Sequence, residues 1–361
     1  MEHLRHFGLS DDPFRNEPLL AQFFESRQQR GALQRLERAV RQGRGLCVVL
    51  GEVGAGKTMV VRQLLENLEE EVFEASMLVV LQGASDARWM LTRFAKQLGV
   101  EDTGVERESL LAEVYEKLAI IREEGRRAVL IIDDAQALAS PSTLAEICGL
   151  LKLEYEERRL LSLVLAGTPV LGRALSRDPV LGRRIEQRVS LESLDPETAA
   201  RYLSHRITNA GGDASLLDGD AVAALHELGG GVPGLMNTLA DNALFEAFLC
   251  GREQVLRTDV VRAHRDLAWD QVAESADNSA DLLLQDEVPQ APLEERRAGA
   301  SLQRSSEATP DFETGSGELD SALDAVFPSD EVAGSEVAPG GAPPKSEEDP
   351  EEDLLVELLD E

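Results

Sequence analysis

Hydrophobic patterning divides the chain into two unlike parts. From Met1 to about Leu267, apolar residues recur at helix or strand spacing. From Gln271 to Glu361, the sequence is dominated by Glu, Asp, Ser, Pro, Gly and Ala. A segment of that composition does not bury enough apolar surface to offset the entropy lost on ordering. We therefore expect an ordered region followed by a disordered acidic tail.

The first half of the ordered region alternates between two patterns. Short apolar runs bounded by Gly, Asp or charged residues predict strands that are buried on both faces. Amphipathic patterns between them predict helices, and the alternation is typical of an α/β fold with a parallel sheet. The predicted strands are Leu46–Leu50, Met77–Leu81, Val129–Ile132 and Leu161–Ala166, and the predicted helices are Lys57–Leu68, Asp86–Leu98, Ser109–Arg122 and Ser142–Glu157.

After Asp195 the patterns are helical only. The predicted helices are Pro196–Asn209, Asp220–Leu228, Pro233–Phe248 and Thr258–Leu267. The first begins at Asp195-Pro196, and the last at Thr258, as helix starts commonly do. We expect an α/β subdomain over residues 1–194, a small all-α lid over 195–268 and the tail over 269–361.

Charge is distributed as unevenly as the apolar residues. The chain has 67 acidic and 36 basic residues, a net charge of −31, and residues 271–361 hold 25 of the acids and 4 of the bases. Such a polyanion does not bind nucleic acid through bulk electrostatics. No stretch approaches the ~18 apolar residues of a membrane-spanning helix, and the sparse cysteines Cys47, Cys148 and Cys250 have no disulfide or zinc spacing. We expect a cytoplasmic protein with reduced cysteines.

One motif carries nucleotide chemistry. Gly51–Thr58 reads GEVGAGKT, follows the strand Leu46–Leu50 and opens a helix, which is the context of a P-loop. Its glycines and the helix N-terminus aim backbone N–H groups at phosphates. We expect Lys57 to reach the β and γ phosphates of ATP and Thr58 to bind Mg²⁺. The expected ATP-binding residues are Gly51, Glu52, Val53, Gly54, Ala55, Gly56, Lys57, Thr58 and Met59.

Polar residues that follow two other strands complete the predicted site. Asp133 directly follows an apolar run and is the expected Mg²⁺-side carboxylate, and Asp134 is the candidate that orients the attacking water. The alternative for the pair is capping of a helix near Ala135. Thr168, at the end of a strand inserted between those of the P-loop and Asp133, is a candidate to face the γ-phosphate, and its alternative is a helix cap before Pro169.

Seven segments carry a longer signature over Met1 to about Leu267. They are Gly8–Pro18, Phe23–Leu36, Gly51–Thr58, Leu130–Leu138, Leu163–Leu171, Asp178–Val189 and Gly230–Leu244. In this order they resemble the AAA+ ATPases of the general secretion pathway protein A (ExeA) type, relatives of TniB-like and Orc-like ATPases. The resemblance implies the sheet order 5-1-4-3-2, an AAA+ C-terminal α subdomain and a homo-oligomer around shared ATP sites.

The resemblance also implies particular residue roles. Asp12–Phe14 is expected near the adenine, and an arginine finger is expected from Arg183, Arg184 or Arg188, because a guanidinium stabilises the charge on a transferring phosphoryl group. Two positions depart from the family: Asp134 replaces a Glu, and Gly234 replaces the sensor 2 Arg. Both departures predict slow hydrolysis, since each removes reach or charge at the phosphates.

The acidic tail contains short apolar clusters. In Asp353–Leu359 the residues Leu354, Leu355, Leu358 and Leu359 would share one face of a helix. Acidic-hydrophobic segments of this kind commonly fold on a partner protein. We expect a protein partner to dock on Asp353–Leu359, and the alternative is a tail that only increases solubility.

Three functional hypotheses follow. The first is a cytoplasmic AAA+ ATPase, an ATP hydrolase that couples Mg-ATP binding or slow hydrolysis to assembly of a secretion, pilus or motility machine. The second is a DNA-linked transposition or replication ATPase of TniB or Orc-like type. The third is a nucleotide-binding adaptor with little hydrolysis.

Overall fold

The computed structural model describes residues 2–80, 86–101, 103 and 106–269. The predicted acidic tail and its docking segment Asp353–Leu359 lie outside the described residues, as does Leu81 at the end of one predicted strand. In the described part of the chain, no helix is both long and apolar enough to cross a membrane.

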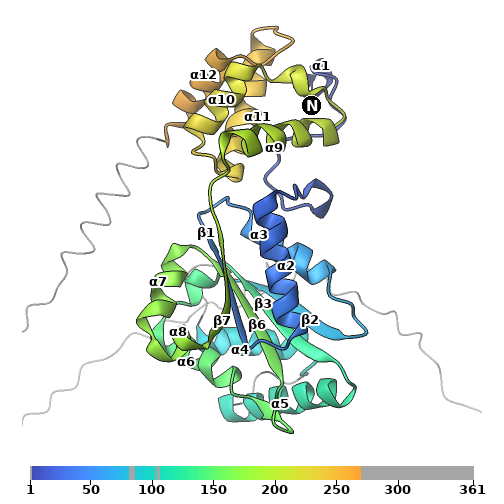
Figure 1. Ribbon diagram of the computed structural model, residues 1–361, viewed down its shortest axis with the longest axis vertical. Helices are drawn as coiled ribbons and strands as arrows, with labels where there is room; N and C mark the ends of the chain where they lie inside the picture. Colours follow the sequence, from blue (N-terminus) through green and yellow to red (C-terminus); the bar gives the residue numbers. More distant parts are fainter. Residues whose placement is uncertain (1, 81–85, 102, 104–105, 270–361) are drawn as a thin grey trace, which may run out of the picture. The chain divides into compact units, whose positions relative to one another are not determined.

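A five-stranded parallel sheet forms the centre of the α/β region (Figure 1). Its strands lie in the order β2-β3-β6-β1-β7. Numbered along the chain within this sheet, that is the predicted order 5-1-4-3-2, which is confirmed. The strands are β1 (Leu46–Gly51), β2 (Phe73–Val79), β3 (Arg127–Asp133), β6 (Leu161–Gly167) and β7 (Ile185–Leu191).

The sheet differs from the sequence prediction in three places. The apolar pattern missed β7, because Ile185–Leu191 is an edge strand that reads IEQRVSL with most of its side chains partly exposed. Strand β2 starts at Phe73, four residues before the predicted start at Met77. The helix predicted to run to Glu157 ends at Leu150, and a two-stranded antiparallel hairpin, β4 (Glu154–Tyr155) and β5 (Arg158–Arg159), follows it.

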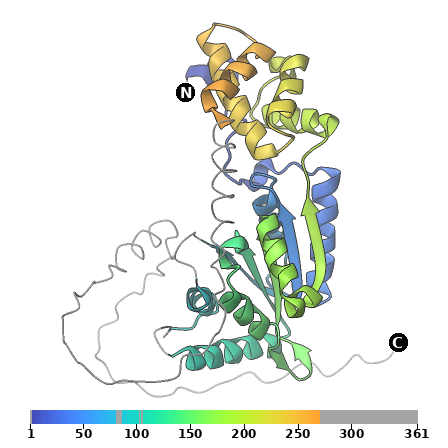
Figure 2. The same ribbon diagram turned by 90° about the vertical axis from the view of Figure 1, so that its left-hand side faces the viewer.

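Helices cover both faces of the sheet (Figures 1 and 2). One face packs on α2 and α3, and the other packs on α4 to α8. Successive side chains of β1 point to opposite faces of the sheet. Cys47 and Val49 pack toward α2 and α3, and Leu46 and Val48 pack toward the layer of α4 to α8. The helices are α2 (Arg27–Arg41), α3 (Lys57–Glu66), α4 (Ala87–Gln97), α5 (Arg107–Glu123), α6 (Pro141–Leu150), α7 (Pro169–Arg177) and α8 (Pro179–Arg184), with the 3-10 turns η1 (Leu20–Gln22) and η2 (Ala135–Leu138).

A separate hydrophobic core holds the last four described helices together. They are α9 (Pro196–Asn209), α10 (Gly219–Leu228), α11 (Pro233–Leu249) and α12 (Arg257–Leu267), with the 3-10 turn η3 (Ala214–Leu216). Asp195 caps α9 by accepting a hydrogen bond from the Thr198 amide at 2.9 Å, and Pro196 follows as the first helical residue, as the sequence predicts.

The N-terminus packs into this helical core. Helix α1 (Glu2–His6) contacts α11, and Leu4, Leu9 and Phe14 are buried among residues of α9 to α12. The first fourteen residues therefore pack with the helices that come after residue 195 and not with the sheet. The division of the chain at residues 194 and 268 stays a prediction.

Candidate functional site

The loop after β1 has the backbone geometry of a phosphate cradle. Gly54 and Gly56 adopt positive φ angles of 82° and 92°, which side-chain-bearing residues rarely adopt. Gly51 is required for a different reason: a Cβ there would lie 2.8 Å from the carbonyl oxygen of Leu191. Helix α3 starts at Lys57, directly after Gly56, so its free N–H groups point into the loop.

The two side chains that begin α3 are both engaged. The Lys57 Nζ donates to the carbonyl oxygens of Gly51 at 3.0 Å and Glu52 at 2.9 Å, so the ammonium group lies folded over the loop. The Thr58 Oγ1 donates to the Asp133 Oδ2 at 2.6 Å. The hydroxyl and the carboxylate that were predicted to hold Mg²⁺ from two different elements therefore lie in direct contact.

Burial shapes the electrostatics of this group. Lys57 and Asp133 are 6 % and 2 % exposed. Burial lowers the pKa of Lys57, although the nearby Asp133, Asp134 and Glu52 carboxylates favour its charged form. Burial also raises the pKa of Asp133, and the hydrogen bond from Thr58 opposes that rise. A divalent cation would favour the ionised carboxylate here, as metal ions generally do at their ligands.

A chain of hydrogen bonds joins the ends of β3 and β6. The Asp134 amide donates to the Asp133 Oδ1 at 3.1 Å, and the Gln136 Nε2 donates to the Asp134 Oδ1 at 3.2 Å. The Gln136 Oε1 then accepts from the Thr168 amide at 3.1 Å. Gln136 thus links both candidate residues. It lies inside the signature segment Leu130–Leu138, but sequence reasoning gave it no role because tertiary packing alone brings the Thr168 amide to it.

Both residues occupy the helix-cap positions of their alternative roles, Asp134 before η2 and Thr168 before Pro169 of α7. Asp134 precedes η2 with a positive φ of 53° and makes no side-chain capping bond, and Thr168 precedes α7 without one. Strand β6 lies between β3 and β1, which places Thr168 at the carboxyl edge between the two motifs as predicted. Thr168 does not line the cavity described next, whereas Asp134 does.

A cavity of about 480 Å³ opens beside the P-loop, within the size range of small-ligand sites. The P-loop contributes Val53, Gly54 and Gly56 to Met59. The N-terminal segment contributes Arg15 to Pro18 and Gln22 to Phe24. The remaining wall is formed by Gln29 of α2, Asp134, Tyr202 and Arg206 of α9, and Pro233 to Leu235, Asn237 and Thr238 of α11.

The N-terminal wall is held by α9. Arg206 is 6 % exposed and donates to the carbonyl oxygens of Pro13 at 2.5 Å and Arg15 at 2.6 Å. Phe14 of the predicted adenine segment points into the helical core, and the residues that follow it line the cavity. The residues that directly follow the predicted adenine segment Asp12–Phe14 therefore line the cavity, whereas the Phe14 ring packs into the helical core and holds the segment there.

Helix α11 meets the P-loop at a glycine pair. The Gly234 amide donates to the Gly54 carbonyl oxygen at 3.0 Å. A Cβ on Gly234 would lie 2.9 Å from the Gly54 Cα. The sensor 2 arginine that the family carries at this position has no room in this arrangement. The glycine that replaces it allows the start of α11 to approach the P-loop backbone.

Unpaired buried atoms cluster around this site. Among the described residues, the buried side-chain atoms without a hydrogen-bond partner are Arg15 Nε, Gln22 Oε1 and Thr168 Oγ1. Arg15 and Gln22 line the cavity, and Thr168 is tied to Asp134 through Gln136. Buried polar atoms are ordinarily paired, so the unpaired Arg15 and Gln22 atoms in the cavity wall fit a polar ligand. Together with the glycine cradle, Lys57 and the Thr58–Asp133 pair, they fit Mg-ATP.

The three candidate arginine fingers are separated. Arg183 and Arg184 end α8 and line a cavity with Gly45, Leu46, Arg159 and Glu186 at the amino end of β1. The P-loop follows the carboxyl end of that strand, and six residues of strand span about 17 Å. Arg188 lies on β7 and lines a third cavity beside α7. None of the three lines the cavity that holds Lys57 and Thr58.

Comparison with known proteins matches this geometry. Residues 40–175 match the family described as AAA domain. The chain is 31% identical over 263 residues, 72% of its length, to the general secretion pathway protein A of Aeromonas hydrophila, and it covers 47% of that protein. It is 29% identical over 159 residues, 42% of its length, to the ORC1-type DNA replication protein of Cenarchaeum symbiosum (strain A), and it covers 37% of that protein.

Solved structures agree on the fold. The crystal structure of Cdc6p from Pyrobaculum aerophilum has a TM-score of 0.58 and 19% identity, covering 72% of this chain and 71% of that one. The resemblance to general secretion pathway protein A and to Orc-like ATPases, predicted from the motifs, is confirmed. The chain spans about half of the first curated relative and just over a third of the second.

Proposed function

We propose that this chain, an AAA+ ATPase similar to general secretion pathway protein A and to Orc-like ATPases, binds Mg-ATP at the P-loop cavity and hydrolyses it slowly. The observation that carries the proposal is the Thr58–Asp133 contact beside Lys57. The hydroxyl and the buried carboxylate come from different elements and would hold Mg²⁺ between them. A bound Mg²⁺ would neutralise phosphate charge and help orient the triphosphate.

The residues around this contact would have different roles in binding and hydrolysing ATP. The P-loop amides and Lys57 would bind the phosphates, and Asp134 would orient the attacking water from the cavity wall. Gln136 would hold Asp134 in place, and Thr168 would supply a hydroxyl that is otherwise unpaired. The absence of a sensor 2 cation at Gly234 and the short carboxylate of Asp134 favour a low rate.

We infer that a second copy of the chain would complete the site. The candidates Arg183 and Arg184 lie at the opposite edge of the sheet from the P-loop of the same molecule. An arginine finger there can reach the phosphates of a neighbouring molecule only. We therefore propose a homo-oligomer in which each ATP lies between two copies, with residues 1–194 and 195–268 acting as core and lid.

The first test is equilibrium binding of Mg-ATP. Lys57→Ala is expected to weaken ATP binding by about 100-fold, since it removes a preorganised charge at the phosphates. Lys152→Ala, at an exposed position remote from the cavity lining, is the matched control and should bind like the wild type. Equal affinities for all three proteins would contradict the proposal. Binding that is retained without measurable hydrolysis would leave the adaptor hypothesis in its place.

The biological setting that we propose follows the first relative. General secretion pathway protein A is named after a secretion pathway. We propose that this chain couples its nucleotide state to assembly of a secretion, pilus or motility machine on the cytoplasmic side, where ATP is supplied. Co-purification of envelope components that depends on ATP and is lost in Lys57→Ala would support this setting.

A DNA-linked function is the second candidate, because the second relative is an ORC1-type DNA replication protein. The acidic excess of the whole chain opposes bulk attraction to DNA, so a contact would be local. Nucleotide-dependent retention of duplex DNA that weakens with salt would favour this candidate. No retention at low salt would exclude it.

A further inference from the structure

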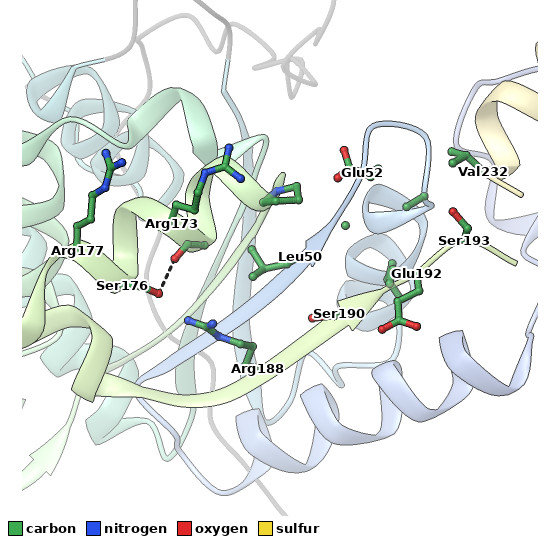
Figure 3. A pocket seen from close by; sticks show the side chains of 15 residues that line it. Leu50, Glu52, Arg173, Ser176, Arg177, Arg188, Ser190, Glu192, Ser193 and Val232 are labelled. Carbon is green, nitrogen blue, oxygen red and sulfur yellow. Dashed lines mark hydrogen bonds between the residues drawn. The ribbon is translucent and has the colours of Figure 1, made fainter. Parts of the chain in front are cut away.

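A second large cavity lies on the other side of the P-loop from the proposed ATP site (Figure 3). Its volume is about 750 Å³, and it is bordered by the end of β1, by α7, by β7 and by the chain that leads from β7 toward α9. Gly51, Glu52 and Ala55 of the P-loop face this cavity, whereas Lys57 and Thr58 face the other. The P-loop is thus a wall shared by two cavities, and the proposed function uses only one of them.

Three arginines gather at the α7 side of this cavity. Arg173 and Arg177 lie one turn apart on α7 with their side chains extending away from β7, and Arg188 extends from β7 toward Ser176 of α7 (Figure 3). All three line the cavity. All three are exposed, and none of their guanidinium groups has an ion-pair or hydrogen-bond partner among the described residues. Elsewhere in the described chain, Arg41, Arg107 and Arg126 are each paired with a carboxylate. We call this group the arginine cluster.

The rest of the cavity has a different character. The apolar side chains of Leu50, Leu191 and Val232 also line the cavity, and we call them the apolar floor. Glu52, Glu192 and Val232 lie at the end away from α7, whereas Leu50 lies closer to it (Figure 3). The two glutamates repel an acidic ligand from that side, so an anionic occupant would lie toward α7. A ligand that fits therefore offers several carboxylates to the arginine cluster and apolar side chains to the floor.

One segment of this chain has that composition. Glu347–Glu361 contains nine acidic residues and no basic one, together with Leu354, Leu355, Leu358 and Leu359. The 77 residues from 270 to 346 connect it to the last described residue, and a chain can extend by about 3.3 Å per residue, so the connection is long enough to reach the cavity. A tethered ligand also acts at an effective concentration that is set by the linker length and does not depend on the protein concentration, so even a weak contact can form within one molecule.

We propose that Glu347–Glu361 docks in this cavity of the same chain, with its carboxylates on the arginine cluster and its leucines on the apolar floor. Nucleic acid phosphates are the competing anions, but they offer no apolar groups for Leu50, Leu191 and Val232. The proposal does not depend on ATP hydrolysis. Because the cavity and the ATP site share the P-loop, docking and ATP binding are expected to influence each other reciprocally.

Disulfide trapping in the full-length chain tests the proposal. Ser176 lines the cavity and is exposed, and Ser346 directly precedes the docking segment. In a Cys250→Ser background, Ser176→Cys combined with Ser346→Cys is expected to form an intramolecular disulfide under mild oxidation. The control pair replaces Ser176→Cys by Ser215→Cys, at an exposed position among the α9–α12 helices. We expect the cavity pair to react about tenfold faster, through its higher effective concentration.

Charge reversal supplies the second arm. Arg173→Glu with Arg177→Glu is expected to lower the cavity pair's rate to that of the control pair, and so is about 1 M salt, at which the Debye length falls to about 3 Å. Arg35→Glu with Arg38→Glu changes the net charge equally on exposed positions of α2 and should leave the rate unchanged. Circular dichroism would verify that both doubly substituted proteins are folded.

Three results would overturn the proposal. The first is equal trapping rates for the cavity and control pairs. The second is a rate that does not respond to reversal of the arginines. The third is disulfide-linked dimers that increase with protein concentration in place of the intramolecular product. Duplex DNA binding that is lost on reversal of Arg173 and Arg177, with trapping rates unchanged, would assign the arginine cluster to phosphates.

Discussion

Charged residues at the two edges of the sheet have different kinds of hydrogen-bond partners. At the amino edge, Glu186 is engaged by Arg44, by Arg159 and by the Gly45 amide. At the carboxyl edge, Lys57 has only backbone carbonyl partners, and the Thr168 hydroxyl has none among the described residues. Glu186 at the amino edge is thus paired within the protein, whereas Lys57 at the carboxyl edge has no side-chain partner among the described residues and lines the cavity beside the P-loop.

The same comparison supports the proposal that two copies form one catalytic site. The groups that would bind phosphates lie at the carboxyl edge, and the arginines Arg183 and Arg184 lie at the amino edge. A rigid sheet keeps them apart. The account therefore predicts that substitutions of the phosphate-binding residues at the carboxyl edge weaken ATP binding, whereas substitutions of Arg183 or Arg184 at the amino edge lower turnover and leave ATP binding unchanged.

The largest effect is expected for the arginines at the amino edge. Arg183→Ala and Arg184→Ala are tested singly, and the one that is the finger should lower kcat by about 10³-fold, as removal of a transition-state cation does. The Kd for ATP should not change, because the arginine does not reach the ATP of its own molecule. The control is Arg158→Ala, an exposed position on β5 next to Arg159, which lines the same cavity as Arg183 and Arg184. A rise in the Kd for ATP that accompanies the fall in kcat would contradict the assignment of phosphate binding to the carboxyl edge alone.

A smaller effect is expected at Asp134. Asp134→Asn keeps the size of the side chain and removes the charge that would orient water, so kcat should fall by about 100-fold, within the range for a lost general base. ATP affinity should stay near the wild-type value, since the phosphate-binding residues are intact. Steady-state ATP hydrolysis measures kcat for Asp134→Asn. Asp266→Asn, at an exposed position on α12, is the control variant. A kcat equal to that of the control would remove Asp134 from the site.

The glycine pair between α11 and the P-loop should respond to a single methyl group. Gly234→Ala places a Cβ 2.9 Å from Gly54, so the contact must open. We expect ATP affinity to fall by about tenfold, or ~1.4 kcal/mol, which lies in the lower part of the ~1–3 kcal/mol range for overpacking. Gly219→Ala, where a Cβ meets nothing within 4 Å, should have no effect. Tighter binding in Gly234→Ala would show that the contact opposes ATP.

The smallest effect is expected for Glu186 at the amino edge of the sheet. Burial alone would raise the pKa of Glu186, but hydrogen bonds from Arg159, the Gly45 amide and Arg44 outweigh burial and hold it below the ordinary 4.5. A depressed carboxyl pKa stabilises the fold above the unfolded pKa, and the stabilisation disappears as the pH falls through the folded pKa. Glu186→Gln should lower the free energy of unfolding by less than about 1 kcal/mol at pH 7, since solvent screens the cluster.

Denaturant titrations of the wild type and Glu186→Gln at pH 7 and below pH 4.5 would measure this effect. The difference in the free energy of unfolding should be present at pH 7 and shrink below pH 4.5. A difference that grows on acidification would contradict the assigned direction of the pKa shift.

The sequence was most informative where chemistry and periodicity coincide. The P-loop glycines, the buried run before Asp133 and the start of α9 at Asp195-Pro196 each combine a pattern with a residue of defined geometry. Strand β7 was missed because an edge strand is partly exposed and lacks a continuous apolar run. Gln136 and Arg206 were missed because their partners, Thr168 and Pro13, are brought to them by tertiary packing alone.

The motif also did not reveal how the arginines are distributed. Arg183, Arg184 and Arg188 lie within six residues of sequence, yet the turn from α8 into β7 directs the first two to one cavity and the last to another. The reason for Gly234 was equally hidden, since the position of Gly54 opposite it depends on the packing of α11 on the P-loop.

A mixing experiment tests the central claim that two copies make one catalytic site. Lys57→Ala supplies intact arginines but a defective P-loop, and the arginine variant that lowers kcat supplies an intact P-loop without its finger. Each protein alone should be nearly inactive, and their mixture should regain ATP hydrolysis well above the sum of the separate rates, because some pairs join an intact P-loop to an intact arginine. A mixture that exchanges subunits yet shows only the sum of the two separate rates would contradict the account.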